Sequence, residues 1–154
     1  MKIKLLCFGR LDTDYFNSAF LDYAKRLKRY CDLEVIELKE EFKFDPEKNK
    51  KINSELALNK MMQNKDYETV IFNVSEKEAI SSEEFSKLIE TNKNKVGKIQ
   101  FLIGPSEGFD KDLINKLHRI SFGRITFPHQ LFRVIVVEQI YRAFKIINNE
   151  IYHK

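Results

Sequence analysis

Three short stretches of this 154-residue chain carry residue types that could bind a ligand: residues 75–77, 104–108 and 121–124. The middle one, Gly104-Pro105-Ser106-Glu107-Gly108, has two glycines, which let a backbone approach a ligand closely. It is too short and wrongly spaced for a phosphate-binding loop or a dinucleotide fingerprint, and it lacks the lysine that cradles phosphate. Taken alone, it fits a tight structural turn as well as it fits a binding loop.

Histidines and cysteines offer little for a metal centre or a catalytic triad. The histidines are too scattered to suggest a metal site, the two cysteines form no CxxC pair, and no Ser-His-Asp or Cys-His arrangement stands out. We therefore expect no metal and two buried thiols in a reducing compartment. The residues concerned are His118, His129, His153, Cys7 and Cys31.

Charged residues in the last apolar segment are more informative. Arg133 interrupts an apolar face, so its charge needs a carboxylate or a phosphate as partner. His129 follows Pro128 and is either a helix-start residue or a functional group at a strand end. Glu138 and Arg142 are four residues apart and can simply pair with each other on one helix face.

Alternating strand and helix patterns must position these residues. Short apolar runs predict strands over residues 3–8, 33–38, 67–74, 99–103 and 124–127. Helical spacing and capping residues predict helices that begin at residues 12–14, 52, 81, 110 and 128 and end near residues 30, 62, 95, 117 and 148. The charged segment 39–51, which holds Pro46, is expected to be a mobile loop.

The strands are apolar on both faces, which indicates an α/β fold with a mostly parallel sheet flanked by helices. The length fits a single domain over residues 1–154, with no repeat and no linker. In such sheets ligands bind at the carboxyl ends of the strands, which is where the three candidate stretches are expected.

Composition narrows the class of protein. Hydrophobic residues make up 43% of the chain, enough for a real core. Lys and Arg outnumber Asp and Glu by 27 to 23, a surplus that permits a polyanionic partner without requiring one. The amino-terminal apolar run is too short for a signal peptide, and no run approaches the roughly 18 residues of a membrane span. We expect a cytoplasmic protein with no membrane partner.

The last predicted helix is apolar nearly all round, so it must be covered on two sides. In a chain of this size one side is expected to face the sheet and the other a second copy, which predicts a homodimer. The alternative is a central helix inside a monomer. The apolar residues are Leu131, Phe132, Val134, Ile135, Val136, Val137, Ile140, Tyr141, Phe144 and Ile147.

Two stretches carry a resemblance to a known family. They are residues 101–109 (FLIGPSEGF) and residues 121–130 (SFGRITFPHQ), the second continuing through Arg133, residues 138–145 and the terminal Tyr152-His153-Lys154. Together with the first strand and the total length, they resemble the 23S rRNA (pseudouridine-N3)-methyltransferases of the SPOUT class. The resemblance covers essentially the whole chain, and its carboxy-terminal part is highly specific.

The resemblance implies a trefoil knot at the carboxy-terminal end of the sheet, a homodimer and S-adenosylmethionine as cofactor. Nothing in the periodicity of the chain predicts a knot, and true knots are rare. The implied reaction is methylation of N3 of a pseudouridine in 23S ribosomal RNA. The implied cofactor-binding residues are Phe72, Gly104, Phe122, Gly123, Arg124, Ile125, Thr126 and Phe127.

Two residues depart from the family's pattern. Pro105 stands where the family usually has a second glycine, and it removes an N–H that a ligand could use. Glu76 stands where the family has a glycine in the loop after the third strand. Both changes are expected to affect cofactor affinity rather than the fold.

Methylation at N3 requires a base, because that nitrogen carries a proton. The resemblance points to the carboxy-terminal tail reaching the partner's cofactor pocket, with His153 or His129 as the base and Tyr152 and Arg133 orienting the substrate. Without the resemblance, a frayed tail would be the simpler interpretation of the last three residues.

The chain has no separate RNA-binding domain, so we expect it to recognise the shape of an assembled ribosome. Lys25, Lys28 and Arg29 share a helix face that is either solvated surface or a phosphate contact. Three alternatives stay open: an enzyme of the same fold acting on transfer RNA, a non-enzymatic ribosome-binding protein, and an unrelated small-molecule enzyme.

Overall fold

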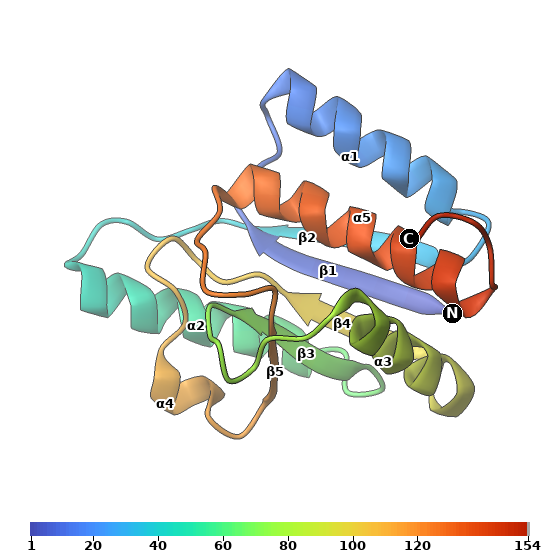
Figure 1. The fold of residues 1–154 in the computed structure, drawn as a ribbon. Coiled ribbons are helices and arrows are strands. Elements are labelled where there is room, and N and C mark those ends of the chain that lie inside the picture. Colours follow the sequence, from blue (N-terminus) through green and yellow to red (C-terminus); the bar gives the residue numbers. More distant parts are fainter. Residues whose placement is uncertain (154) are drawn as a thin grey trace.

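Five parallel strands form one sheet in the order β2-β1-β4-β3-β5 in the computed structural model, which describes residues 1–153 (Figure 1). Every neighbouring pair of strands runs in the same direction. The strands are β1 (Lys2–Phe8), β2 (Asp32–Leu38), β3 (Glu68–Asn73), β4 (Lys98–Leu102) and β5 (His118–Ser121). The predicted α/β class with a parallel sheet is confirmed.

Helices cover both faces of this sheet (Figure 1). The strands alternate their side chains between two apolar clusters, so that Leu5 and Cys7 belong to one cluster and Leu6 and Phe8 to the other. The larger cluster is closed by α1 (Asp14–Leu27), α3 (Ser82–Lys95) and α5 (His129–Ile147), and the smaller one by α2 (Pro46–Met62) and α4 (Lys111–Ile114).

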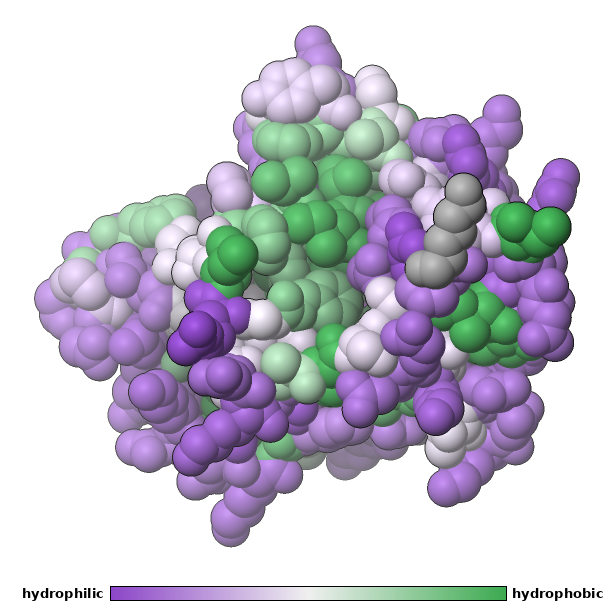
Figure 2. Space-filling model, in the orientation of Figure 1, coloured by the Kyte–Doolittle hydropathy of each residue, from purple (hydrophilic) through white to green (hydrophobic). Residues whose placement is uncertain are grey.

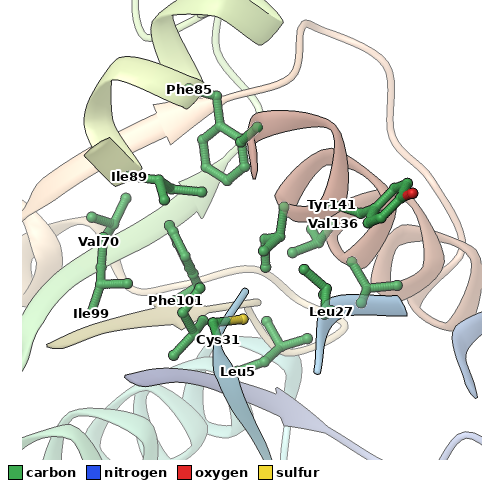
Figure 3. Close-up of a cluster of buried hydrophobic side chains, with 14 of the residues drawn as sticks. Leu5, Leu27, Cys31, Val70, Phe85, Ile89, Ile99, Phe101, Val136 and Tyr141 are labelled. Atoms are coloured by element: carbon green, nitrogen blue, oxygen red, sulfur yellow. The ribbon is translucent and has the colours of Figure 1, made fainter. Parts of the chain in front are cut away.

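The larger cluster brings together residues far apart in the sequence. Phe85 and Ile89 of α3 point toward Phe101 and Val70 on the sheet, while Val136 of α5 closes the other side (Figure 3). All five are fully buried. This packing fixes α3 and α5 on the sheet, and their amino-terminal ends lie next to the loops that form the site described below.

The segment between β2 and α2 is a correction to the sequence prediction. The mobile loop expected over residues 39–51 ends early, because α2 begins at Pro46 rather than at Ile52. The Asp45 side chain accepts a hydrogen bond from the Lys48 backbone N–H at 3.1 Å, and proline suits the first helical position. The sequence prediction missed the capping Asp45 and Pro46, because the many charged residues around them suggested a loop.

The last strand is a second correction. No strand forms over residues 124–127; instead β5 covers His118–Ser121. It directly follows the region predicted as a helix over 110–117, of which only α4 is helical. β5 pairs with β3 only from Val70↔His118 to Asn73↔Ser121. So short a strand has too few apolar residues to give a recognisable strand pattern in the sequence. Gly123, at φ +116°, then turns the chain away from the sheet.

Helix α5 crosses the middle of one face and packs between α1 and α3 (Figure 1). The chain therefore leaves β5 at one edge of the sheet and returns as α5 toward the strands at its centre. This path is consistent with the carboxy-terminal knot that the resemblance implies. The predicted last helix is confirmed, starting one residue after Pro128.

Candidate active site

A cavity of about 290 Å³ opens at the carboxyl ends of the central strands. Its walls come from the loops after β3, β4 and β5 and from the first turn of α5, as expected for a ligand site in a parallel sheet. Residues from four separate segments line it: Phe72, Asn73, Val74, Ile103, Gly104, Pro105, Ser106, Glu107, Gly108, Phe109, Phe122, Gly123, Ile125, Thr126, Phe127, His129 and Phe132.

Aromatic rings form the floor of this cavity. The Phe72 ring lies 5.0 Å from the Phe122 ring and 5.3 Å from the Phe132 ring, both in edge-to-face geometry, measured between centroids. Phe127 stacks on Phe132 at 5.9 Å with an interplanar angle of 15°. Such a floor favours a flat apolar ligand group, because aromatic rings gain from edge and stacking contacts.

Gly104 sits where a side chain would crowd a neighbouring ring. A Cβ atom placed there would lie 3.1 Å from two carbons of the Phe109 ring, which itself lines the cavity. Because Gly104 has no side chain, the Phe109 ring can lie close to it and a ligand can reach the Gly104 backbone.

The loop 104–108 is held by a carboxylate from another segment. Glu40, which follows β2, accepts hydrogen bonds from the Ser106 backbone N–H at 2.6 Å and from the Ser106 hydroxyl at 3.1 Å. The loop closes on itself through the Gly108 N–H and the Pro105 carbonyl at 2.8 Å. Sequence reasoning missed Glu40, because nothing in its local pattern links it to Ser106.

Ser121 joins the two loops on the other side of the cavity. Its hydroxyl oxygen accepts hydrogen bonds from the Ser75 N–H at 3.1 Å and the Gly123 N–H at 3.0 Å, and the hydroxyl donates to the Gly123 carbonyl at 2.7 Å. Ser121 itself is fully buried at the end of β5. The segments after β3 and β5 are therefore fixed relative to each other.

The predicted cofactor-binding residues gather around this cavity with one exception. Phe72, Gly104 and the run from Phe122 to Phe127 line it, apart from Arg124. The Arg124 side chain is 75% exposed and lies 3.4 Å from the Glu76 carboxylate. Glu76, which stands where the family resemblance implies a glycine, is thus the ion-pair partner of Arg124.

His129 lines the cavity from the first residue of α5. Burial lowers the pKa of its imidazole, since the charged form loses hydration, and the positive charge of Arg133 acts in the same direction, while Glu40 opposes it. The ring is therefore biased toward its neutral form, which is the form that can accept a proton.

Arg133 does not face the cavity. Its side chain is buried, and its guanidinium donates to the Glu37 carboxylate at 2.8 Å, to the Gly9 carbonyl at 2.6 Å and to the Phe8 carbonyl. The carboxylate partner expected for this residue is present. All of these acceptors lie at the ends of β1 and β2, so the arginine joins α5 to the sheet.

The described part of the tail, up to His153, folds onto its own subunit. The Tyr152 hydroxyl donates to the Glu138 carboxylate at 3.1 Å, and the ring packs edge-on against Tyr141. One ring nitrogen of His153 lies 2.8 Å from the Glu83 carboxylate and the other 3.4 Å from Arg142. Neither tail residue lines the cavity, and Lys154 lies outside the described residues.

Several lining residues were not predicted. Ile103, Pro105 and Phe109 flank the glycine that was, and Phe132 follows His129 by three positions, almost one helical turn. Contiguity and helical spacing could therefore have found them. Asn73, the last residue of β3, and Val74 directly follow the predicted Phe72, so contiguity could have found them as well.

Metal-ligating and redox groups are not clustered. Within residues 1–153, no group of three or more His, Cys, Asp or Glu side chains could hold a metal ion. Burial raises the pKa of both Cys7 and Cys31 to about 12, so both thiols stay protonated and unreactive. In the same residues no helix is long and apolar enough to cross a membrane.

A parallel sheet flanked by helices, with a glycine-lined cavity at its carboxyl edge, defines an α/β ligand-binding fold. Residues 1–153 match the model of the family described as "Predicted SPOUT methyltransferase". The chain belongs to the SPOUT methyltransferase family.

Curated relatives match the full length. The chain is 53% identical over 156 residues to "Ribosomal RNA large subunit methyltransferase H" of Mesoplasma florum, with 100% of both chains covered. It is 52% identical to the protein of that name from Mycoplasma capricolum, again over 100% of both chains, and 41% identical to that of Caldicellulosiruptor saccharolyticus over 99% of both.

A solved structure supports the fold. It is described as "a probable methylase family protein from Haemophilus influenzae Rd KW20", and it matches with a TM-score of 0.51 at 13% identity. The match covers 96% of this chain and 66% of the other. At this identity the likeness concerns the fold alone.

Proposed function

We propose that this protein transfers a methyl group from S-adenosylmethionine to N3 of a pseudouridine in 23S ribosomal RNA, acting as a homodimer in the cytoplasm. The observation that carries the proposal is the full-length identity of 53% with a ribosomal RNA large subunit methyltransferase. The cavity at the carboxyl edge of the sheet supports it, because it gathers residues from the three segments that hold the implied cofactor-binding residues.

The cavity suits an adenosine-containing cofactor. Its volume of about 290 Å³ lies near the lower end of the roughly 300–1,000 Å³ found for small-molecule sites. Phe72, Phe127 and Phe132 offer faces and edges to a purine ring, and Gly104 leaves its backbone accessible. When bound there, the cofactor would supply an electrophilic methyl group on a sulfonium.

Pro105 has no N–H to offer, and the Ser106 N–H is already bonded to Glu40. Ligand hydrogen bonds on this side of the cavity would therefore rely on Gly104 and on carbonyl groups. The departure at position 105 leaves the loop closed and ordered through the Gly108 N–H, so it does not exclude a functional site.

The residue that removes the N3 proton is one of two histidines. His129 lies in the cavity with an imidazole biased toward its neutral form, and it is positioned by the helix start. His153 is the alternative, since a tail from the second subunit could bring it to the same place. A base in either position would accept the proton as the nitrogen attacks the methyl carbon in line.

Tyr152 and His153 would act across the subunit interface. On their own subunit they are bonded to Glu138 and Glu83, on the face formed by α3 and α5. A dimer that places this face beside the partner's cavity would complete a composite site. Arg133 would hold the scaffold of the site, because its two terminal nitrogens donate to Glu37 and to two backbone carbonyls, while its buried Nε has no partner among the described residues.

The direct test is methyl transfer from labelled S-adenosylmethionine to ribosomes that lack the modification, with the label mapped by mass spectrometry. Label on N3 of a 23S pseudouridine is the expected result. Label on transfer RNA offered in parallel would redirect the proposal to another RNA. Failure to bind S-adenosylmethionine in a titration would overturn it in favour of a non-enzymatic ribosome-binding role.

A further inference from the structure

The segment that joins β2 to α2 presents two aromatic rings to solvent. Phe42 is 66% exposed and Phe44 is 44% exposed, although both stand in a short connection with no strand or helix of its own. We call residues 39–45 the aromatic loop. Exposed phenylalanines close together at an edge of the sheet are uncommon and mark a surface that meets a partner.

The aromatic loop is held rigidly in spite of its exposure. The buried side-chain amide of Asn53 accepts from the Glu41 N–H at 2.7 Å and donates to the Glu41 carbonyl at 3.0 Å. The buried Asn49 does the same for Phe44, at 3.1 and 2.7 Å. Two asparagines of α2 thus fix the backbone on both sides of Phe42.

Acidic groups of this region are used internally. The Glu41 carboxylate accepts from the N–H groups of Phe42 and Lys43, at 3.0 and 2.9 Å, and Asp45 caps α2. Hydrogen bonds from the backbone, that of Lys43 foremost, lower the pKa of Glu41. The charges of Lys43 and Lys39 act in the same direction but less strongly, and in the described part of the chain neither lysine forms an ion pair with Glu41.

A lysine lies against one of the two rings, and the loop and the start of α2 carry further lysines. Lys48 lies over the Phe44 ring, with its Nζ 4.0 Å from the centroid. Among the ion pairs within residues 1–153, none involves Lys39, Lys43 or Lys51. Rings with cations beside them match a chain of stacked bases and phosphates.

The aromatic loop is joined to the cavity. Glu40, within the loop, accepts both hydrogen bonds from Ser106, which lines the cavity. In Figure 1 the connection between β2 and α2 lies at the same end of the sheet as the loops after β3, β4 and β5. A strand of RNA whose target base enters the cavity would therefore pass close to Phe42.

We propose that the aromatic loop is a second RNA contact, at which Phe42 and Phe44 stack with unpaired bases next to the methylated nucleotide and the lysines bind the adjoining phosphates. This inference rests on the proposed function and names how the substrate is held. Asn49 and Asn53 already fix the loop before RNA binds, so little conformational entropy is lost on binding.

A tryptophan reporter tests the contact without catalysis. The chain has no tryptophan, so Phe42→Trp creates a single fluorophore at the loop, and Met62→Trp creates a matched one, 54% exposed, at the far end of α2. We expect a single-stranded RNA oligonucleotide to quench the Phe42→Trp emission, with weaker quenching by an RNA duplex of equal length. The Met62→Trp emission should stay unchanged.

Steady-state kinetics tests the contact in the reaction. With ribosomes as substrate, Phe42→Ala/Phe44→Ala should raise KM by roughly fivefold to a hundredfold, the range expected for losing stacked bases, while kcat at saturation changes little. The affinity for S-adenosylmethionine should remain that of the wild type, since the Glu40–Ser106 bonds are intact. Met62→Ala is the matched control and should leave KM unaltered.

The outcomes separate the two proposals. Wild-type protein that methylates no ribosomal RNA would contradict the proposed function, and the tryptophan titration would still test the loop. Normal methylation with an unchanged KM in the double variant would overturn the loop contact. So would Phe42→Trp emission that responds to protein concentration alone, indicating a second copy on the loop, or to anionic lipid vesicles but not to RNA.

Discussion

At the scale of single residues, His129 and Arg133 lie about one helical turn apart but face different surroundings. His129 faces the cavity, whereas the Arg133 guanidinium is buried against Glu37 and two backbone carbonyls. Sequence analysis proposed a functional role for both. For Arg133 the sequence cannot separate a cation buried against protein acceptors from one that binds a phosphate, because either one interrupts an apolar helix face. Only the positions of the hydrogen-bond acceptors in the structure distinguish these two cases.

Replacing Arg133 by methionine should destabilise the protein by about 1–3 kcal/mol, because the Phe8 and Gly9 carbonyls lose their donor. Glu37 contributes less, since its side chain is 38% exposed and keeps the Leu11 N–H as a donor. Urea unfolding followed by circular dichroism measures this, with Lys28→Met on the surface of the molecule as the control. An unchanged unfolding midpoint combined with a large loss of kcat would instead return Arg133 to a direct role in the reaction.

The pH dependence of the reaction should identify the base. Because burial lowers the pKa of His129, its neutral form persists below the ordinary value of about 6.5, and the rate should fall only as the pH drops through the lowered pKa. In His129→Gln, kcat should drop by roughly 10²–10⁴ and this acidic limb should vanish. If the limb survives in His129→Gln and is lost in His153→Gln, the tail carries the base.

At the scale of elements, the loops that follow the strands form most of the site, and the first turn of α5 adds His129 and Phe132. Four of the five strands and most helices could be predicted, since apolar runs and capping residues such as Ser81 are local signals. The aromatic loop, the Glu40–Ser106 bonds and the turn at Gly123 could not, because they depend on contacts between segments far apart in sequence. Family resemblance, rather than pattern, supplied the cofactor residues.

The loop after β4 depends on the missing side chain at position 104. Gly104→Ala would push the Phe109 ring from its place, at a cost of about 1–3 kcal/mol in cofactor affinity, because the added Cβ meets the ring at 3.1 Å. Isothermal titration with S-adenosylmethionine measures the change. Gly104→Ala/Phe109→Leu should recover part of the affinity, and additive losses in the double variant would show that the two positions are not coupled.

At the scale of the whole molecule, one face remains incompletely covered. The face that carries α1 and α5 gathers apolar surface around a hollow in its middle, with hydrophilic residues at the margin (Figure 2). Leu21 of α1 is 56% exposed, and Ile135 of α5 lines a shallow hollow beside Phe127. Helix α5 is therefore apolar nearly all round for two reasons: one side packs on the sheet, and the other side contributes to this open face.

A charge on this face should prevent the proposed dimer from forming. Ile135→Glu places a carboxylate in the apolar surface, and we expect sedimentation equilibrium to change from dimer to monomer at micromolar concentration. Val96→Glu, at an exposed position after α3, is the control and should remain dimeric. Wild-type protein that sediments as a monomer at every concentration would contradict the dimer itself.

The bonds of Arg133 also bear on how the chain reaches its final path. The acceptors of this guanidinium lie 96 to 125 residues earlier in the sequence, at the ends of β1 and β2. If α5 docks before those strands have paired, or docks in the wrong place, a charge is buried with nothing to receive its protons, at a cost of several kcal/mol. Arg133 thus favours the arrangement in which α5 lies on the paired ends of β1 and β2, because only there are its hydrogen bonds made.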